Sequence, residues 1–168
     1  MMRLAVPLLL TLLAAGCASS GAVPAPFPVP GPAPSALPAT IPADIPSDLP
    51  RPAVVGTALS LQGAPYRNGG TDPSGFDCSG FVTYVFAQQG LALPRTVLEQ
   101  YDSGRDVPSA SPGDLVFFST VAPGASHVGI AISADEFVHA PSSSGVVRVE
   151  RLAAPYWSSR FVGIRRVM

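Results

Sequence analysis

Proline is unevenly distributed along this chain, and its distribution decides which part can fold into a core. Residues 18–50 hold ten of the 20 prolines in the 168-residue sequence. Proline lacks a backbone N–H donor, so this stretch cannot form the interior of a helix or a sheet. We expect residues 18–50 to be a disordered tether, which at about 3.1 Å per residue could span on the order of 100 Å. Residues 51–168 are expected to form one domain, large enough for a core without disulfides.

The first 17 residues have the pattern of an export signal. A positive start at Arg3 is followed by an apolar run over residues 4–13 and by small residues before Cys17. The apolar run is shorter than the roughly 20 residues of a membrane-spanning helix. The pattern resembles a lipoprotein signal, which implies cleavage before Cys17 and lipid attachment to that residue; an ordinary secretory signal is the alternative. Since Ala18 follows the cysteine where an aspartate would resemble an inner-membrane signal, we expect a lipid anchor at the periplasmic face of the outer membrane.

The charge balance gives no reason to expect a nucleic-acid partner. The net charge is −1, from ten basic and eleven acidic residues. Proteins that bind nucleic acid carry clustered lysine and arginine, which neutralise phosphates. The sequence therefore predicts no nucleic-acid partner, and we expect a monomer.

The hydrophobic pattern of residues 51–168 changes from helical to strand-like along the chain. Helices are expected at residues 54–62, from the N-cap Asp77 to near Gly90, and at residues 96–102. Strands are expected at residues 114–119, 127–133, 136–140, 146–151 and 160–167. Helices followed by strands predict an α+β fold with an antiparallel sheet.

Cys78 is the one thiol expected to stay free, because Cys17 belongs to the export signal and no partner remains for a disulfide. It follows the expected N-cap, so it lies in the first turn of a helix, where free N–H groups and the helix dipole favour an anion. We therefore expect a lowered pKa for the Cys78 thiol and a thiolate accessible near neutral pH. The same N–H groups could donate to an oxyanion, and Ser79 and Gly80 are small enough for a substrate to approach. A buried structural cysteine is the alternative.

The two histidines of the chain both lie on expected strands. Side chains alternate along a strand, so His127 shares a face with Gly129 and Ala131. We expect these small residues to leave a gap for a helix end or a substrate, over which the imidazole could contact Cys78 and act as its base. His139, on a neighbouring strand, is expected to hydrogen-bond and orient the His127 ring. A structural histidine is the alternative at each position.

One cysteine and two histidines could also bind zinc with an open fourth position. The spacing of Cys78, His127 and His139 matches no compact metal-binding motif. We therefore predict no metal and no other cofactor.

Several short stretches of the domain, taken in order, resemble the NlpC family of bacterial cell-wall cysteine peptidases. They are residues 63–70, 75–82, 93–95, 112–118, 126–130 and 137–140. Two closing stretches, residues 155–157 and 165–167, resemble the lipoprotein murein endopeptidase branch of that family. The resemblance covers essentially all of residues 54–168 and departs from the family pattern at Val97, where serine is common.

The resemblance implies a papain-like fold, in which a helix that carries the cysteine packs on a small antiparallel sheet. It implies that Cys78 is the nucleophile, His127 the base and His139 the third member of a triad. It also implies a set of residues that line the site and contact the oxyanion or the peptide: Tyr66, Asp77 and Ser79.

Three other residues in the domain are expected to be structural. Arg95 is expected to anchor a loop, and Asp114 to hold the turn at the start of a strand. Trp157 is expected in the core, with a sugar platform as the alternative.

The expected activity is hydrolysis of amide bonds in peptidoglycan stem peptides, through a thioester on Cys78 that water releases. The resemblance implies cleavage between D-glutamate and the diamino acid, or of peptide crosslinks at D-alanine, and the sequence does not choose between these bonds. Two alternatives use the same fold. One is a non-catalytic peptidoglycan-binding lipoprotein, and the other is an amidase or acyltransferase with the same triad.

Overall fold

The computed structural model describes residues 51–143 and 145–168. The expected export signal, the lipid-bearing Cys17 and the expected tether lie outside the described residues. Among the helices of the described part, none has both the length and the apolar character of a bilayer-spanning segment.

The predicted helices and strands occur in the predicted order, and the described residues add three two-residue strands and one four-residue helix that were not predicted. The helices are α1 (Arg51–Ser60), α2 (Cys78–Ala87), α3 (Val97–Ser103) and α4 (Pro155–Ser158). The strands are β1 (Thr71–Asp72), β2 (Gly75–Phe76), β3 (Arg105–Asp106), β4 (Leu115–Phe118), β5 (His127–Ala131), β6 (Glu136–His139), β7 (Arg148–Arg151) and β8 (Phe161–Arg166). The predicted first helix begins earlier, at Arg51, because Pro52 is compatible with the first turn of a helix.

Six strands form one sheet in the order β3-β8-β4-β5-β6-β7, and every neighbouring pair is antiparallel. β1 and β2 form a separate small hairpin beside α2. The prediction of an α+β fold with an antiparallel sheet is confirmed.

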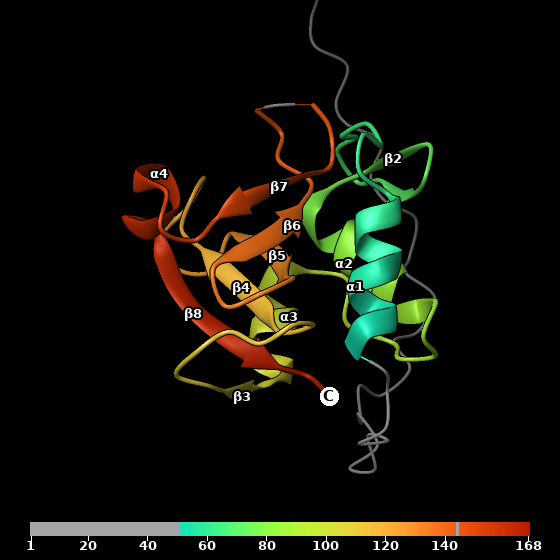
Figure 1. Ribbon diagram of the computed structural model, residues 1–168. Helices are drawn as coiled ribbons and strands as arrows, with labels where there is room; N and C mark the ends of the chain where they lie inside the picture. The colour runs from blue at the N-terminus through green and yellow to red at the C-terminus, as the bar shows by residue number, and fades with distance from the viewer. Residues whose placement is uncertain (1–50, 144) are drawn as a thin grey trace, which may run out of the picture. The chain divides into compact units, whose positions relative to one another are not determined.

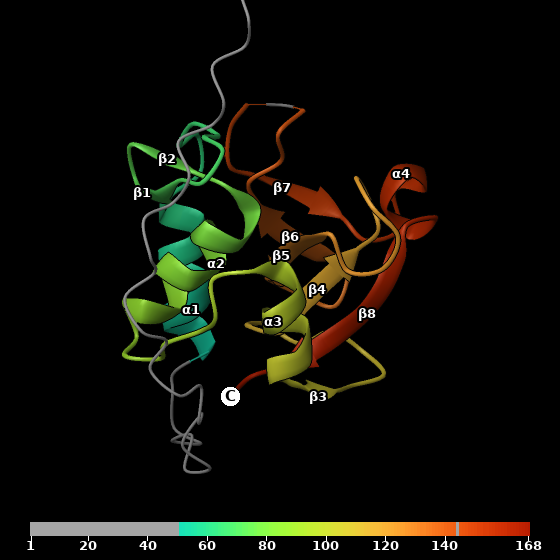
Figure 2. The same cartoon turned by 180° about the vertical axis from the view of Figure 1, so that it is seen from behind.

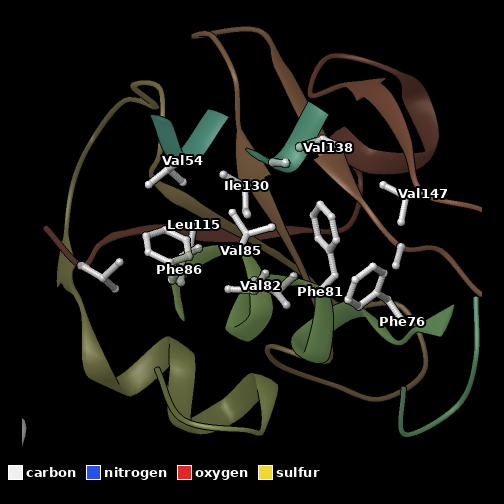
Figure 3. Close-up of a cluster of buried hydrophobic side chains, with 14 of the residues drawn as sticks. Val54, Phe76, Phe81, Val82, Val85, Phe86, Leu115, Ile130, Val138 and Val147 are labelled. Atoms are coloured by element: carbon white, nitrogen blue, oxygen red, sulfur yellow. The ribbon is translucent and has the colours of Figure 1, made fainter. Parts of the chain in front are cut away.

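Each face of the sheet is covered by its own hydrophobic cluster. α1 and α2 cover one face (Figure 1; Figure 2 shows the reverse side). There the apolar side of α2 packs on alternate residues of the central strands (Figure 3), and the cluster includes Phe81, Val85, Phe86, Leu115, Ile130 and Val138. A second cluster covers the opposite face and includes Val116, Phe118, Ala131, Phe137, Trp157 and Ile164. The central strands are therefore buried on both sides.

Asp114 has the structural role predicted for it at the start of β4. Its side chain is fully buried and accepts a hydrogen bond from the Ser111 N–H at 2.8 Å. Arg166 of β8 donates to both carboxylate oxygens, from Nε and from Nη2, each at 2.7 Å. A bidentate ion pair of this kind satisfies a buried charge and ties the strand-start turn to β8.

Candidate active site

The N-terminus of α2 places Cys78 beside β5, an interior strand of the sheet. Asp77 is the N-cap, as predicted, and its carboxylate accepts a hydrogen bond from the Gly80 N–H at 2.7 Å. Cys78 is the first residue of α2, and α2 packs against β5. Backbone N–H groups of Ser79, Val128 and Cys78 itself act on the Cys78 sulfur. Since Val128 follows His127 in β5, the sulfur lies beside the start of the strand that carries the histidine.

The predicted direction of the Cys78 pKa is wrong. Burial raises the pKa of the Cys78 thiol, and the negative charge of Asp77 raises it further. The hydrogen bonds from the backbone N–H groups lower the pKa, as expected at a helix N-terminus, but they do not offset the loss of water. In the resting molecule the protonated thiol is therefore favoured over the thiolate.

The two histidines form a buried, hydrogen-bonded pair. His127 lies at the start of β5 and His139 at the end of β6, with His127 Nε2 and His139 Nδ1 2.7 Å apart. Burial lowers the pKa of His127 to about 4. It also lowers the pKa of His139, to which the charges of His127 and Arg148 add. Both rings are neutral at neutral pH, so His127 is able to accept a proton.

The small residues near His127 do not leave the gap predicted for a helix end or a substrate. A Cβ on Gly129 would lie 2.6 Å from Cδ2 of Phe137 and 3.1 Å from Cβ of His139. The space is filled by these side chains from β6, and α2 packs instead on the Val128 side of β5. Glycine at position 129 lets His139 approach the strand closely enough to meet His127.

The hydrogen bond between the rings limits which nitrogen carries the proton. For the free Nδ1 of His127 to accept a proton, Nε2 must carry the hydrogen and donate it to His139 Nδ1. The hydrogen of neutral His139 then lies on its Nε2, which is buried without a hydrogen-bond partner among the described residues. The Trp157 ring lies at right angles to His139, with centroids 4.8 Å apart.

Trp157 is buried as predicted, but it also contacts the histidine pair directly. Its ring stacks on His127 at an interplanar angle of 24° with centroids 5.5 Å apart. An aromatic ring stacked on an imidazole excludes water from it, which agrees with the lowered pKa of His127. No pattern in the sequence pointed to this contact, because it joins α4 to β5 across the sheet.

The three residues predicted to line the site lie around Cys78. Tyr66 pairs in an isolated β-bridge with Phe76, two residues before Cys78, and its pKa is raised by burial and by the charges of Cys78 and Asp77. Ser79 is buried, and its hydroxyl accepts a hydrogen bond from Arg95 Nη1 at 2.8 Å. Arg95 also donates to both oxygens of Asp77, at 3.0 and 2.6 Å. Arg95 therefore anchors its loop, as predicted, and does so on the residue that caps α2.

Gln100 supports the N-terminus of α2, and this role was not predicted from the sequence. It is fully buried, and its Nε2 donates to Ser79 O at 3.1 Å and to Pro94 O at 2.8 Å. The signal that could have found it is the helical spacing of α3, where Gln100 follows the partly buried Val97 by one turn. It joins the loop before α3 to the first turn of α2.

The described residues do not have the geometry of the alternative zinc site. Within residues 51–143 and 145–168, no three histidine, cysteine or acidic side chains are grouped so that they could hold one metal ion. The facing nitrogens of His127 and His139 are bonded to each other, so they do not point at a shared ion.

A small hollow of about 80 Å³ opens beside the histidine pair. Its walls include Thr120, Val121, His127, Tyr156 and Trp157. His127 therefore lines a surface hollow whose other walls come from residues 120–121, from residues 141–143 and from α4.

A helix that begins at a cysteine and packs on an antiparallel sheet bearing a histidine pair defines a papain-like fold. Sequence comparison gives the family within that class. The chain belongs to the NlpC/P60 family, whose sequence model matches residues 63–166. The resemblance inferred from the short stretches is thereby confirmed.

Named relatives are bacterial cell-wall enzymes. The chain is 44% identical over 110 residues to murein DD-endopeptidase MepS/murein LD-carboxypeptidase of Escherichia coli, covering 64% of this chain and 57% of that protein. It is 41% identical over 113 residues to the probable peptidoglycan endopeptidase LytE of Bacillus subtilis, covering 67% of this chain and 33% of that protein. The chain thus spans between a third and just over half of these relatives.

A solved structure has the same fold. A Staphylococcus aureus protein described as similar to a lipoprotein of the NLP/P60 family superposes with a TM-score of 0.64 at 32% identity. The match covers 70% of this chain and 41% of that one.

Proposed function

We propose that this chain is a cysteine endopeptidase that hydrolyses amide bonds in peptidoglycan stem peptides. The observation that carries the proposal is the position of the Cys78 sulfur beside the start of β5, the strand whose first residue, His127, is hydrogen-bonded to His139 of β6. Membership of the NlpC/P60 family and the activities named for MepS and LytE support the substrate class.

In the proposed mechanism, Cys78 attacks the scissile carbonyl while His127 removes the thiol proton. The raised pKa of the thiol and the lowered pKa of the imidazole favour a neutral resting pair, so proton transfer accompanies attack. His139 holds the His127 ring in the tautomer that accepts at Nδ1. The result is a thioester on Cys78, and His127 returns the proton to the leaving amine.

Groups around the nucleophile would stabilise the tetrahedral intermediate and the substrate. Backbone N–H groups at the start of α2 and the Tyr66 hydroxyl, whose pKa the Cys78 charge raises, are suited to donate to the oxyanion. Asp77 and Ser79, joined by Arg95, form a polar rim that could bind the peptide backbone. Water then attacks the thioester, with His127 as base, and releases Cys78.

We further propose that lipid on Cys17 anchors the enzyme at the periplasmic face of the outer membrane. This proposal rests on the small residues before Cys17 and on Ala18 after it. A proline-rich tether over residues 18–50 would let a monomeric domain reach the wall. Labelling cells with a radioactive fatty acid tests it: the wild-type protein should carry label and Cys17→Ser should not. Label on neither protein would contradict the anchor.

Digestion of purified muropeptides tests the activity. Wild-type protein should release products that differ from the substrate by one hydrolysed amide, as read by mass spectrometry. Cys78→Ala should release none while keeping the circular dichroism spectrum of the wild type. Binding to sacculi without any product from the wild type would instead indicate a wall-binding protein.

A further inference from the structure

A second hollow adjoins the one at His127. It has a volume of about 250 Å³, and its walls are Ser143, Arg148, Glu150, Ala154, Pro155, Tyr156 and Trp157. Ser143, Tyr156 and Trp157 also line the smaller hollow at His127. The two hollows therefore adjoin each other at these three residues, and together we call them the groove, which has His127 at one end and Arg148 and Glu150 of β7 at the other. The larger hollow, at about 250 Å³, is below the roughly 300 Å³ at which drug-sized ligand sites begin, so it suits a small group.

The charged end of the groove lies on β7, beside His139 of the neighbouring strand. Arg148 of β7 is the direct cross-strand partner of His139 of β6. Opposite residues in an antiparallel pair project from the same face of the sheet, with Cβ atoms about 5 Å apart. The charge of Arg148 acts on the His139 ring, which agrees with this placement. Glu150 is two residues further along β7 and so projects from the same face.

The charges in the groove are a matched pair. Arg148 Nη2 forms an ion pair with Glu150 Oε1, and the two side chains are 44% and 24% exposed. A ligand with only a carboxylate would be repelled by Glu150, and a ligand with only an ammonium would be repelled by Arg148. A group that carries both charges side by side complements the pair without leaving either charge unmatched.

The proposed proton transfer from His127 indicates which part of the substrate occupies the groove. His127 must protonate the leaving amine, so the leaving group lies beside His127. The groove begins at His127 and leads away from it. It therefore receives the amino acid whose amine is released.

We propose that Arg148 and Glu150 bind a zwitterionic amino-acid centre, an ammonium beside a carboxylate, at the far end of the substrate's diamino acid. Arg148 pairs with the carboxylate and Glu150 with the ammonium, while Tyr156 and Trp157 pack along the methylene chain between them. This inference rests on the proposed endopeptidase function and refines its specificity. A stem peptide cut between D-glutamate and the diamino acid keeps this centre free, whereas a crosslink acylates its ammonium. The groove therefore favours the uncrosslinked stem.

Three tripeptides test the inference, each L-alanyl-γ-D-glutamyl followed by a different diamino acid. The first ends in meso-diaminopimelate with a free zwitterionic centre, the second in its carboxamide, and the third in lysine, which lacks that carboxylate. The wild type should cleave the first with a kcat/KM at least tenfold above that of the other two. The difference should lie in KM, with similar kcat values. A crosslinked muropeptide dimer, the kind of substrate named for MepS, serves as the fourth substrate.

Arg148→Met and Glu150→Gln should each reduce the preference to less than threefold. Glu150→Gln is the more specific variant, because the charge of Glu150 is not among those that shift the pKa of His139. Arg151→Met is the matched control: Arg151 lies on the same strand but projects from the opposite face, and it should keep the wild-type preference.

The inference is overturned if the wild type cleaves the three tripeptides equally or if both groove variants keep the preference. It is also overturned if the wild type cuts the D-glutamate–diamino acid bond faster in the dimer stem whose ammonium is acylated than in the free tripeptide. In each of these cases cleavage still occurs, so the proposed endopeptidase function stands. Failure of the wild type to cleave any of the four substrates overturns the function itself and the inference with it.

Discussion

The buried histidine pair predicts a domain that loses stability when the pH falls from 7 to 5. The chain has only these two histidines, and burial lowers the pKa of His127 to about 4 and that of His139 to about 2. In the unfolded chain both pKa values return to about 6.5. Below that pH the unfolded chain binds protons that the folded domain does not, so the free energy of unfolding decreases as the pH falls.

The size of the loss follows from these pKa values. A histidine that titrates only in the unfolded chain lowers the free energy of unfolding by about 2 kcal/mol between pH 7 and pH 5, and the pair by about 4 kcal/mol. Carboxylates contribute little here, because their ordinary pKa values lie near 4. Small domains unfold with about 5–15 kcal/mol, so the expected loss is a large part of the total.

Replacing His139 with leucine separates the contributions of the two histidines to the loss of stability at low pH. Leucine removes one titrating ring and the buried Nε2 that has no partner in the described structure, so the fold should persist at pH 7. Urea unfolding at pH 7, 6 and 5 should show the loss halved, to about 2 kcal/mol. The exposed control Gln62→Ala should keep the full wild-type loss.

Two results would refute this reasoning. The first is a wild-type free energy of unfolding that stays constant between pH 7 and pH 5. The second is a His139→Leu variant that loses as much as the wild type, because the loss would then come from groups other than the buried pair.

Two further substitutions test the packing around the site. Gly80→Ala should lower the free energy of unfolding by about 1–3 kcal/mol, because its Cβ would lie 2.0 Å from the Gly70 carbonyl oxygen; a urea midpoint equal to that of the wild type would contradict the close approach. Trp157→Leu should move the acid limb of the kcat/KM profile to higher pH, because water reaches His127 and raises its pKa toward 6.5. An acid limb that does not move would show that the stacked ring does not set that pKa.

Elements with a strong local signal could be predicted from the sequence, and short elements could not. α2 has an N-cap at Asp77 and is followed by a glycine with positive φ at Gly90, and both signals lie next to the helix in the sequence. β3 has only two residues, Arg105 and Asp106, and it exists because they pair with β8 at the other end of the domain. A two-residue strand has no periodicity to read, so only its distant partner defines it.

The candidate site likewise has features that the sequence predicts and features that depend on tertiary packing. A thiol at a helix start and two histidines on strands could be chosen by residue type and position. The contact between His127 and His139 depends on β5–β6 register and on the space at Gly129, which Phe137 and His139 fill. The gap predicted at this point was wrong because side chains from another strand occupy it.

The sequence by itself determined the α+β order of elements, the family, and the residues that could carry chemistry, because these depend on residue type and on neighbours a few positions away. The tertiary structure alone decided the ionisation of those residues and the charge pair beside them. Desolvation depends on everything packed around a group, which is why burial raises the Cys78 pKa against the local effect of the helix end. The same packing sets Arg148 opposite His139, a neighbour that no local pattern could supply.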